Sequence, residues 1–149
     1  MAESSLGQQA LASLVIGEQR AVIEPGAIRT ARRFMHGELG RRLAAEWKDV
    51  YCALAVPGPY SPDHASAGKR GLRNLALAYL VDAEAPDALE LARAQLLAAE
   101  NMTEVQGALV AIVNSAAPWK ADALAQLARA WSNEPLLMNK WLQVQATAM

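Results

Sequence analysis

The sequence has little of what β-sheet proteins and nucleic-acid-binding proteins need. Valine, isoleucine and threonine number 16 among 149 residues, against 52 alanines and leucines, so strong helix formers dominate. This ratio excludes a β-sandwich or a β-barrel. The charges nearly cancel, with 14 basic and 15 acidic residues, so no general attraction to nucleic acid or to an anionic membrane is expected.

Cysteine and long apolar runs are also scarce. The single Cys52 cannot form an internal disulfide, and its helical surroundings predict a small buried residue. No stretch approaches the roughly 18 apolar residues of a membrane span, and the N-terminus lacks a basic signal region. We therefore expect a soluble, cytoplasmic chain with no membrane partner.

The residue patterns of common active sites are missing as well. The two histidines, His36 and His64, do not form the His-Glu-x-x-His pair that places two zinc ligands on one helical face. Gly68-Lys69-Arg70-Gly71 lacks the spacing of a phosphate-binding loop. The residues themselves therefore predict no catalytic, metal-binding or cofactor-binding position.

Apolar residues do recur at three- and four-residue spacing, which predicts amphipathic helices. The first covers roughly residues 5–16. The second helical region begins at Pro25 and extends to Leu54, either as one kinked helix or as two in tandem, because Gly37 and Gly40 weaken it. Residues 56–64 contain three prolines and predict a loop. Five more apolar stripes follow, at residues 72–80, 88–96, 105–113, 124–131 and 137–144.

Only a few residues separate these later stripes. Short connections favour antiparallel neighbours, and hairpins repeated about every 30 residues are typical of α-solenoids. We therefore predict an all-α fold of stacked antiparallel helical hairpins, as part of a right-handed superhelix of the HEAT or armadillo kind. Residues 1–149 would form a single helical-repeat segment with a proline-rich loop near residues 56–64.

Four residues are candidates for structural roles. Asn101 stands three residues before Glu104, the spacing of a capping box, and is expected to cap a helix. Trp141 lies on an apolar stripe and is expected to pack in the interior. Gly68 and Gly71 are predicted to lie on a helix where a missing side chain allows a neighbouring helix to approach.

A cluster of basic residues is a candidate contact surface. Arg29, Arg32 and Arg33 share a helical face with His36. Acidic residues lie close by in the sequence, and the interleaved aromatics of single-strand binders are missing. A docking surface for another protein segment is therefore favoured over a nucleic-acid site.

Three stretches suggest a family. They are GKRGLRNLALAYL at residues 68–80, AENMTE at residues 99–104 and MNKWLQVQA at residues 138–146. Their sequence, order and intervals resemble the C-terminal region of bacterial aminopeptidase N, a zinc metallopeptidase family of the gluzincin type that removes N-terminal residues from peptides. Weaker similarity extends the resemblance from about residue 18 to residue 147.

The resemblance implies a non-catalytic fragment of a larger C-terminal domain that helps to enclose the active-site chamber of a parent enzyme. Peptides, zinc and a catalytic domain would be the substrates, cofactor and partner of that parent. The zinc motif and the Gly-x-Met-Glu-Asn segment of the family do not occur here. The alternative is a free-standing α-solenoid that binds other proteins.

The resemblance also bears on the last helix, because in the family further helices follow the third stretch. The apolar residues of this helix, part of whose surface is therefore expected to be exposed, are Leu136, Leu137, Trp141, Leu142 and Val144. Self-association through this C-terminal face is a further expectation.

Overall fold

The chain folds into helices throughout the part that its computed structural model describes, residues 22–148. The helix expected over residues 5–16 lies outside this part. Residues 22–148 form seven helices and no strand, so the predicted all-α class is confirmed. The helices are α2 (Pro25–Arg42), α3 (Ala44–Ala53), α4 (His64–Asp82), α5 (Ala88–Ala98), α6 (Met102–Val113), α7 (Lys120–Ala130) and α8 (Pro135–Ala146).

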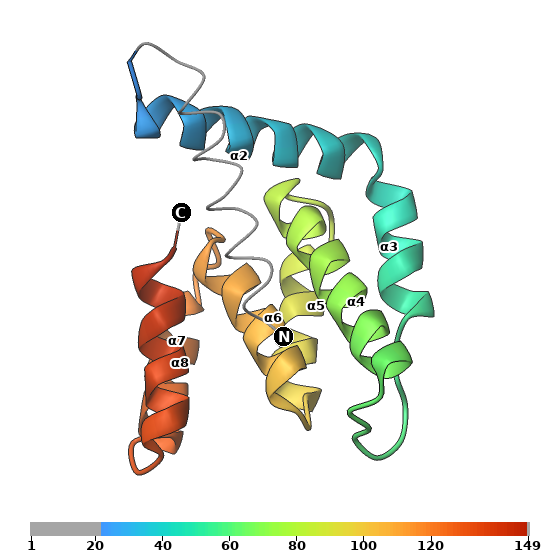
Figure 1. The fold of residues 1–149 in the computed structure, drawn as a ribbon, viewed down its shortest axis with the longest axis vertical. Helices are drawn as coiled ribbons and strands as arrows, with labels where there is room; N and C mark the ends of the chain where they lie inside the picture. Colours follow the sequence, from blue (N-terminus) through green and yellow to red (C-terminus); the bar gives the residue numbers. More distant parts are fainter. Residues whose placement is uncertain (1–21, 149) are drawn as a thin grey trace.

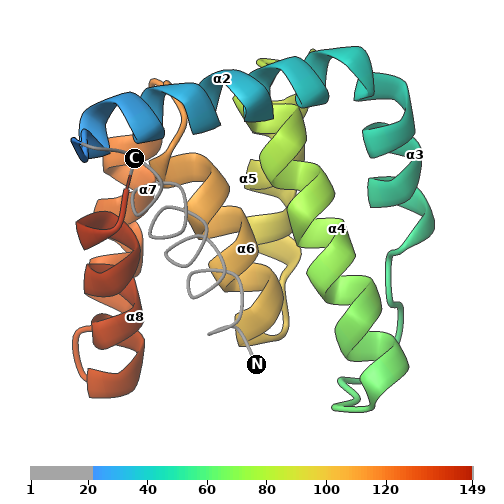
Figure 2. The same ribbon diagram turned by 45° about the horizontal axis from the view of Figure 1, so that its top comes forward.

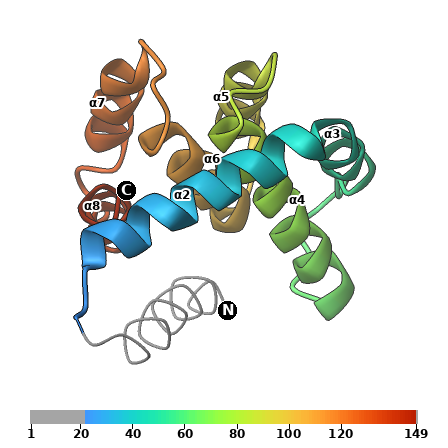
Figure 3. The same ribbon diagram turned by 90° about the horizontal axis from the view of Figure 1, so that it is seen from above.

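Three helical hairpins, α3–α4, α5–α6 and α7–α8, are stacked side by side (Figure 1). Their second helices, α4, α6 and α8, pack against one another in that order, whereas α5 and α7 lie on one side of this row (Figure 3). Helix α2 crosses one end of the stack and contacts α4 (Figure 2). In the last two hairpins, α5–α6 and α7–α8, connections of only a few residues keep the two helices side by side and antiparallel.

The region from Pro25 to Leu54 is two helices in tandem. The helical geometry breaks at Leu43, where φ is −115° and ψ is 27°. Gly40 lies before the break and serves packing, since a Cβ there would lie 2.8 Å from the Ala83 Cβ and closer still to the Tyr79 carbonyl oxygen. The missing side chain thus lets α2 cross the end of α4.

The core lies between α4, α5 and α6. Its largest fully buried side chains are those of Leu77, Leu80, Leu109 and Ile112. Ala76, Ala92 and Ala108 are also fully buried, so the alanine-rich composition lets these helices pack closely. A second apolar cluster joins α6 to α7 and α8.

That second cluster consists of Leu109, Val113 and Val144, with partly buried residues of α7 around them. Trp141 ties α8 to α7, because its indole nitrogen donates a hydrogen bond of 3.0 Å to the Leu124 carbonyl oxygen. Leu136 is 80% exposed and Leu142 is 53% exposed. This face of α8 therefore presents apolar side chains to solvent.

Two predicted packing positions are corrected. Within residues 22–148, a Cβ at Gly68 or at Gly71 would meet no atom within 4 Å, so none of the described helices approaches α4 there. Their face of α4 is exposed, and it also carries the exposed side chains of Leu72 and Leu75. Cys52 is exposed rather than buried, because it lies on the side of α3 that faces away from α4.

The proline-rich segment, residues 55–63, contains no helix and ends at a capped helix start. The Asp63 carboxylate accepts hydrogen bonds from the Ser66 amide at 2.9 Å and from the Ser61 hydroxyl at 2.6 Å. These hydrogen bonds hold the pKa of the Asp63 carboxyl well below its usual range, and the bond from Ser61 has the largest effect.

Within residues 22–148, no helix has the length and apolar character that a membrane crossing requires.

Candidate functional site

The described residues do not assemble a metal centre. Nowhere in residues 22–148 do three or more histidine, cysteine, aspartate or glutamate side chains come together as potential ligands. A catalytic zinc site takes three protein ligands. The described residues of this chain therefore do not fit the zinc that the resemblance implies for a parent enzyme.

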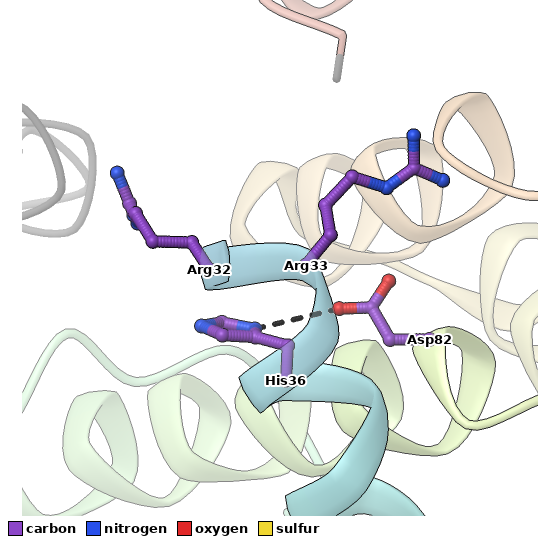
Figure 4. Close-up of a pocket in the computed structure, with 4 residues that line it drawn as sticks. All are labelled: Arg32, Arg33, His36 and Asp82. Atoms are coloured by element: carbon purple, nitrogen blue, oxygen red, sulfur yellow. Dashed lines mark ion pairs between the residues drawn. The ribbon is translucent and has the colours of Figure 1, made fainter. Parts of the chain in front are cut away.

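The basic face of α2 forms a small polar contact with α4 (Figure 4). His36 and Asp82 point toward each other, with 3.4 Å between His36 Nδ1 and Asp82 Oδ2. Arg32 and Arg33 point in different directions beside them. The space that these four residues enclose is about 10 Å³, enough for roughly one water molecule, so it is no ligand cleft.

Aromatic stacking fixes the orientation of this contact. The His36 ring stacks on Tyr79 with 4.9 Å between centroids, and Tyr79 stacks on Trp47 at 4.5 Å. The stack therefore links α2, α4 and α3. The side chains of Arg29 and Arg33 are exposed, as a docking surface requires.

A second polar feature lies in the interior of the stack. We call the side chains of Arg73, Asn74, Gln95, Asn101 and Glu104 the polar network. Gln95 is 4% exposed, and the Arg73 and Glu104 side chains are 17% and 14% exposed. Polar groups buried to this extent need hydrogen-bond partners, and the network supplies most of them.

Arg73 and Glu104 form the charged part of the polar network. Arg73 Nη1 lies 3.3 Å from Glu104 Oε1, while Arg73 Nε donates to the Tyr51 carbonyl oxygen at 3.1 Å. The guanidinium also lies over the Tyr51 ring, 4.2 Å from its centroid. One arginine thus connects α3, α4 and α6.

Asn101 caps α6 and holds the same glutamate. Its side-chain oxygen accepts a hydrogen bond of 3.0 Å from the Glu104 amide, and its side-chain nitrogen donates to Glu104 Oε2 at 2.7 Å. The two carboxylate oxygens of Glu104 therefore bind two different side chains. Rotation of the Glu104 side chain would break one of these contacts.

Asn74 and Gln95 extend the polar network to α5. Asn74 donates to the Thr103 carbonyl oxygen at 2.9 Å, and Gln95 donates to Asn74 Oδ1 at 2.8 Å and to the Glu104 carbonyl oxygen at 3.0 Å. A Cβ at Gly107 would overlap the Asn74 carboxamide. Gly107 is thus a glycine that permits close approach between α4 and α6.

Residue patterns alone identified only Asn101 and Glu104 of the polar network. Arg73 and Asn74 share the buried side of α4 with Leu77 and Leu80, at three- and four-residue spacing. Polar residues on an otherwise apolar helical face were the available signal. Two of the stretches that carry the family resemblance, residues 68–80 and 99–104, meet at this network.

Comparisons with known proteins agree with that resemblance. A family described as a domain of unknown function, DUF3458_C, with ARM repeats, matches residues 11–149. The chain is 34% identical over 124 residues to aminopeptidase N of Caulobacter vibrioides and 32% identical over 127 residues to that of Escherichia coli. It is 28% identical over 130 residues to aminopeptidase N of Haemophilus influenzae.

These matches cover most of this chain and little of the relatives. They include 82%, 85% and 87% of the chain, but only 14%, 14% and 15% of the three relatives. The similarity therefore concerns one region of proteins that are much longer than this chain.

Proposed function

Because the chain belongs to the DUF3458_C family of ARM-repeat domains and corresponds to the C-terminal domain of bacterial aminopeptidase N, we propose that it is a non-catalytic segment of such an aminopeptidase. The parent would remove N-terminal residues from peptides in the cytoplasm. The segment would help to enclose the chamber in which the peptide is cleaved. The observation that carries the proposal is the family match over residues 11–149.

Zinc would belong to the parent as a metallopeptidase, where it would polarise the scissile carbonyl and activate water. Residues outside the described part of this chain would have to hold it, because residues 22–148 bring no set of ligands together. The role left for the described residues is mechanical. The two apolar clusters and the polar network keep three hairpins in fixed register, which gives a rigid wall.

Attachment to the catalytic domain would use the exposed arginines of α2. Helix α2 crosses the end of the stack (Figure 1), and the side chains of Arg29 and Arg33 are exposed, with Arg32 between them in sequence. Guanidinium groups suit such a contact, because they bind carboxylates through two parallel hydrogen bonds. The acceptor would be an acidic surface of the catalytic domain.

A complementation experiment tests this proposal. Caulobacter vibrioides aminopeptidase N would be produced without its matched region and mixed with the purified chain. We expect a stable complex, slower cleavage of long peptides, and little change with a short aminoacyl-anilide, since only long substrates meet the wall. Arg29→Glu with Arg33→Glu should weaken the complex, whereas Arg129→Glu, an exposed charge on α7, should not.

Two results would contradict the proposal. One is zinc-dependent cleavage of an aminoacyl-anilide by clean preparations of the chain alone. The other is a natural reading frame that encodes this chain without a zinc motif elsewhere in the protein, which would favour a free-standing α-solenoid that binds other proteins.

A further inference from the structure

A recess of about 210 Å³ opens between the proline-rich loop and the start of α6. Tyr60 and its neighbours in the loop form one wall, and Arg70, Glu100, Asn101 and Glu104 form much of the rest. A cavity of roughly 150 Å³ already admits benzene. The recess therefore has room for a small organic molecule.

Arg70 is the unusual residue of this recess. It is 3% exposed, yet it forms no ion pair within residues 22–148. Its Nη2 donates to the Ser61 carbonyl oxygen, its guanidinium lies 4.8 Å from the centroid of the Tyr60 ring, and its buried Nε has no hydrogen-bond partner among the described residues. A buried arginine is normally paired with an anion, and the described part of the chain supplies no counter-charge to Arg70.

Arg73, one turn further along α4, shows what a paired arginine looks like in this fold. Its guanidinium also lies over a tyrosine ring and also donates to a backbone carbonyl, but it has the carboxylate of Glu104 at 3.3 Å. Among the described residues, Arg70 has the first two kinds of contact but not the third. A carboxylate or a similar anion would complete the same set of contacts at Arg70.

The acidic residues of the recess narrow the choice of ligand. Glu104 already binds Arg73 and Asn101. Glu100 is exposed and forms no ion pair with the described residues. Arg70 and Glu100 together contribute no net charge, so a ligand that carries one charge of each sign matches them better than a polyanion such as phosphate.

We propose that the recess binds the zwitterion of a free α-amino acid. The carboxylate would pair with the Arg70 guanidinium, and the ammonium would face Glu100. The apolar side chain of the ligand would lie against Val56 and Pro59 of the loop. This inference goes beyond the proposed function, and it does not depend on any activity of a parent enzyme.

Calorimetric titration of the purified 149-residue chain with L-leucine tests the inference. We expect saturable binding with one ligand per chain. L-leucinamide lacks the carboxylate and N-acetyl-L-leucine lacks the ammonium, so each should bind at least about tenfold more weakly, the effect of losing one charged contact.

Variants separate ligand binding from loop packing. Glu100→Gln changes an exposed side chain, so it should leave the melting temperature unchanged and weaken leucine binding about tenfold. Arg70→Lys keeps a positive charge but removes the planar guanidinium, and should weaken binding to a similar extent. Lys69→Met removes the neighbouring exposed cation of α4 and should leave binding unchanged.

Either of two outcomes would overturn the inference. The first is no saturable heat with L-leucine up to about 50 mM, several times the Kd of roughly 6 mM that two weak charged hydrogen bonds would give. The second is leucine binding that L-leucinamide matches or that Glu100→Gln does not weaken. Arg70 would then serve only to hold the loop through the Ser61 carbonyl and the Tyr60 ring.

Discussion

The crossing of α2 over α4 depends on the absence of a side chain at Gly40. In Gly40→Ala the new methyl carbon would lie 2.8 Å from the Ala83 Cβ and still closer to the Tyr79 carbonyl oxygen. Neither obstacle can rotate away, because one is backbone and the other is attached directly to it. The two helices must therefore separate.

The size of this effect follows from two opposing contributions. Overpacking costs about 1–3 kcal/mol, and the upper part of this range applies where the backbone has to move. Alanine recovers up to about 1 kcal/mol in helix propensity. We therefore expect a net loss of about 1–2 kcal/mol and, at about 2–4 °C per kcal/mol, a melting temperature lower by about 2–8 °C.

Gly71→Ala is the matched control, because Gly71 lies inside α4 and no atom of residues 22–148 lies within 4 Å of the added methyl group. This variant should gain about 0.5–1 kcal/mol and melt about 1–4 °C higher. Thermal unfolding followed by circular dichroism at the helix band measures both. If Gly40→Ala is as stable as the original chain, or if both variants shift in the same direction, the close crossing of α2 and α4 is wrong.

Three further predictions concern single side chains. Asn101→Ala removes the side chain that caps α6 and should lower the free energy of unfolding by about 1 kcal/mol. Asn101→Ser keeps a capping oxygen and should lower the free energy of unfolding by less. Equal losses in the two variants would contradict the cap. Because folding lowers the pKa of Asp63, this carboxylate stabilises the folded chain above its unfolded pKa of about 3.9, and the stabilisation is lost as the pH falls below that value. In Asp63→Asn the free energy of unfolding should therefore fall less steeply between about pH 4 and pH 2. An unchanged pH profile would argue against this contribution. Trp141→Phe removes the hydrogen bond to the Leu124 carbonyl and should lower the urea midpoint by the equivalent of about 1 kcal/mol with an unchanged slope; an unchanged midpoint would show that this bond does not stabilise the chain.

The helices and their breaks were predictable because their signals are local. Periodic apolar residues mark each helix, and prolines mark the loop that ends at Asp63. The Asn101 cap is also local, since donor and acceptor lie three residues apart. The tandem arrangement of α2 and α3 is one of the two predicted alternatives, and the sequence left both open because Gly37 and Gly40 weaken a helix without fixing where it ends.

The orientation of each helix in the stack was less predictable. Leu72 and Leu75 are part of the predicted apolar stripe at residues 72–80, yet they are 44% and 45% exposed, while Leu77 and Val81 are buried. An amphipathic face becomes unambiguous only when polar residues oppose it. In an alanine-rich helix the contrast is weak, so the packing partners decide which side is buried.

The polar network was hidden for a related reason. Arg73 and Glu104 are 31 residues apart in the sequence, and Gln95 and Asn74 are 21 apart. Pattern reading assigns such side chains to solvent, since lysine, arginine and glutamate are seldom buried without partners. Only the fold shows that each of these residues has a partner in the interior.

This network also explains what kind of information the family resemblance carries. An alanine or leucine in the core can be exchanged for another apolar residue of similar volume at small cost. Glu104 cannot be exchanged so freely, because its two oxygens bind Arg73 and Asn101 and removing one partner leaves a buried charge uncompensated. The segments that meet at this network are therefore under strong constraint from folding alone. A resemblance that includes these segments identifies the scaffold, and the chemistry of a parent enzyme has to be tested through its own residues.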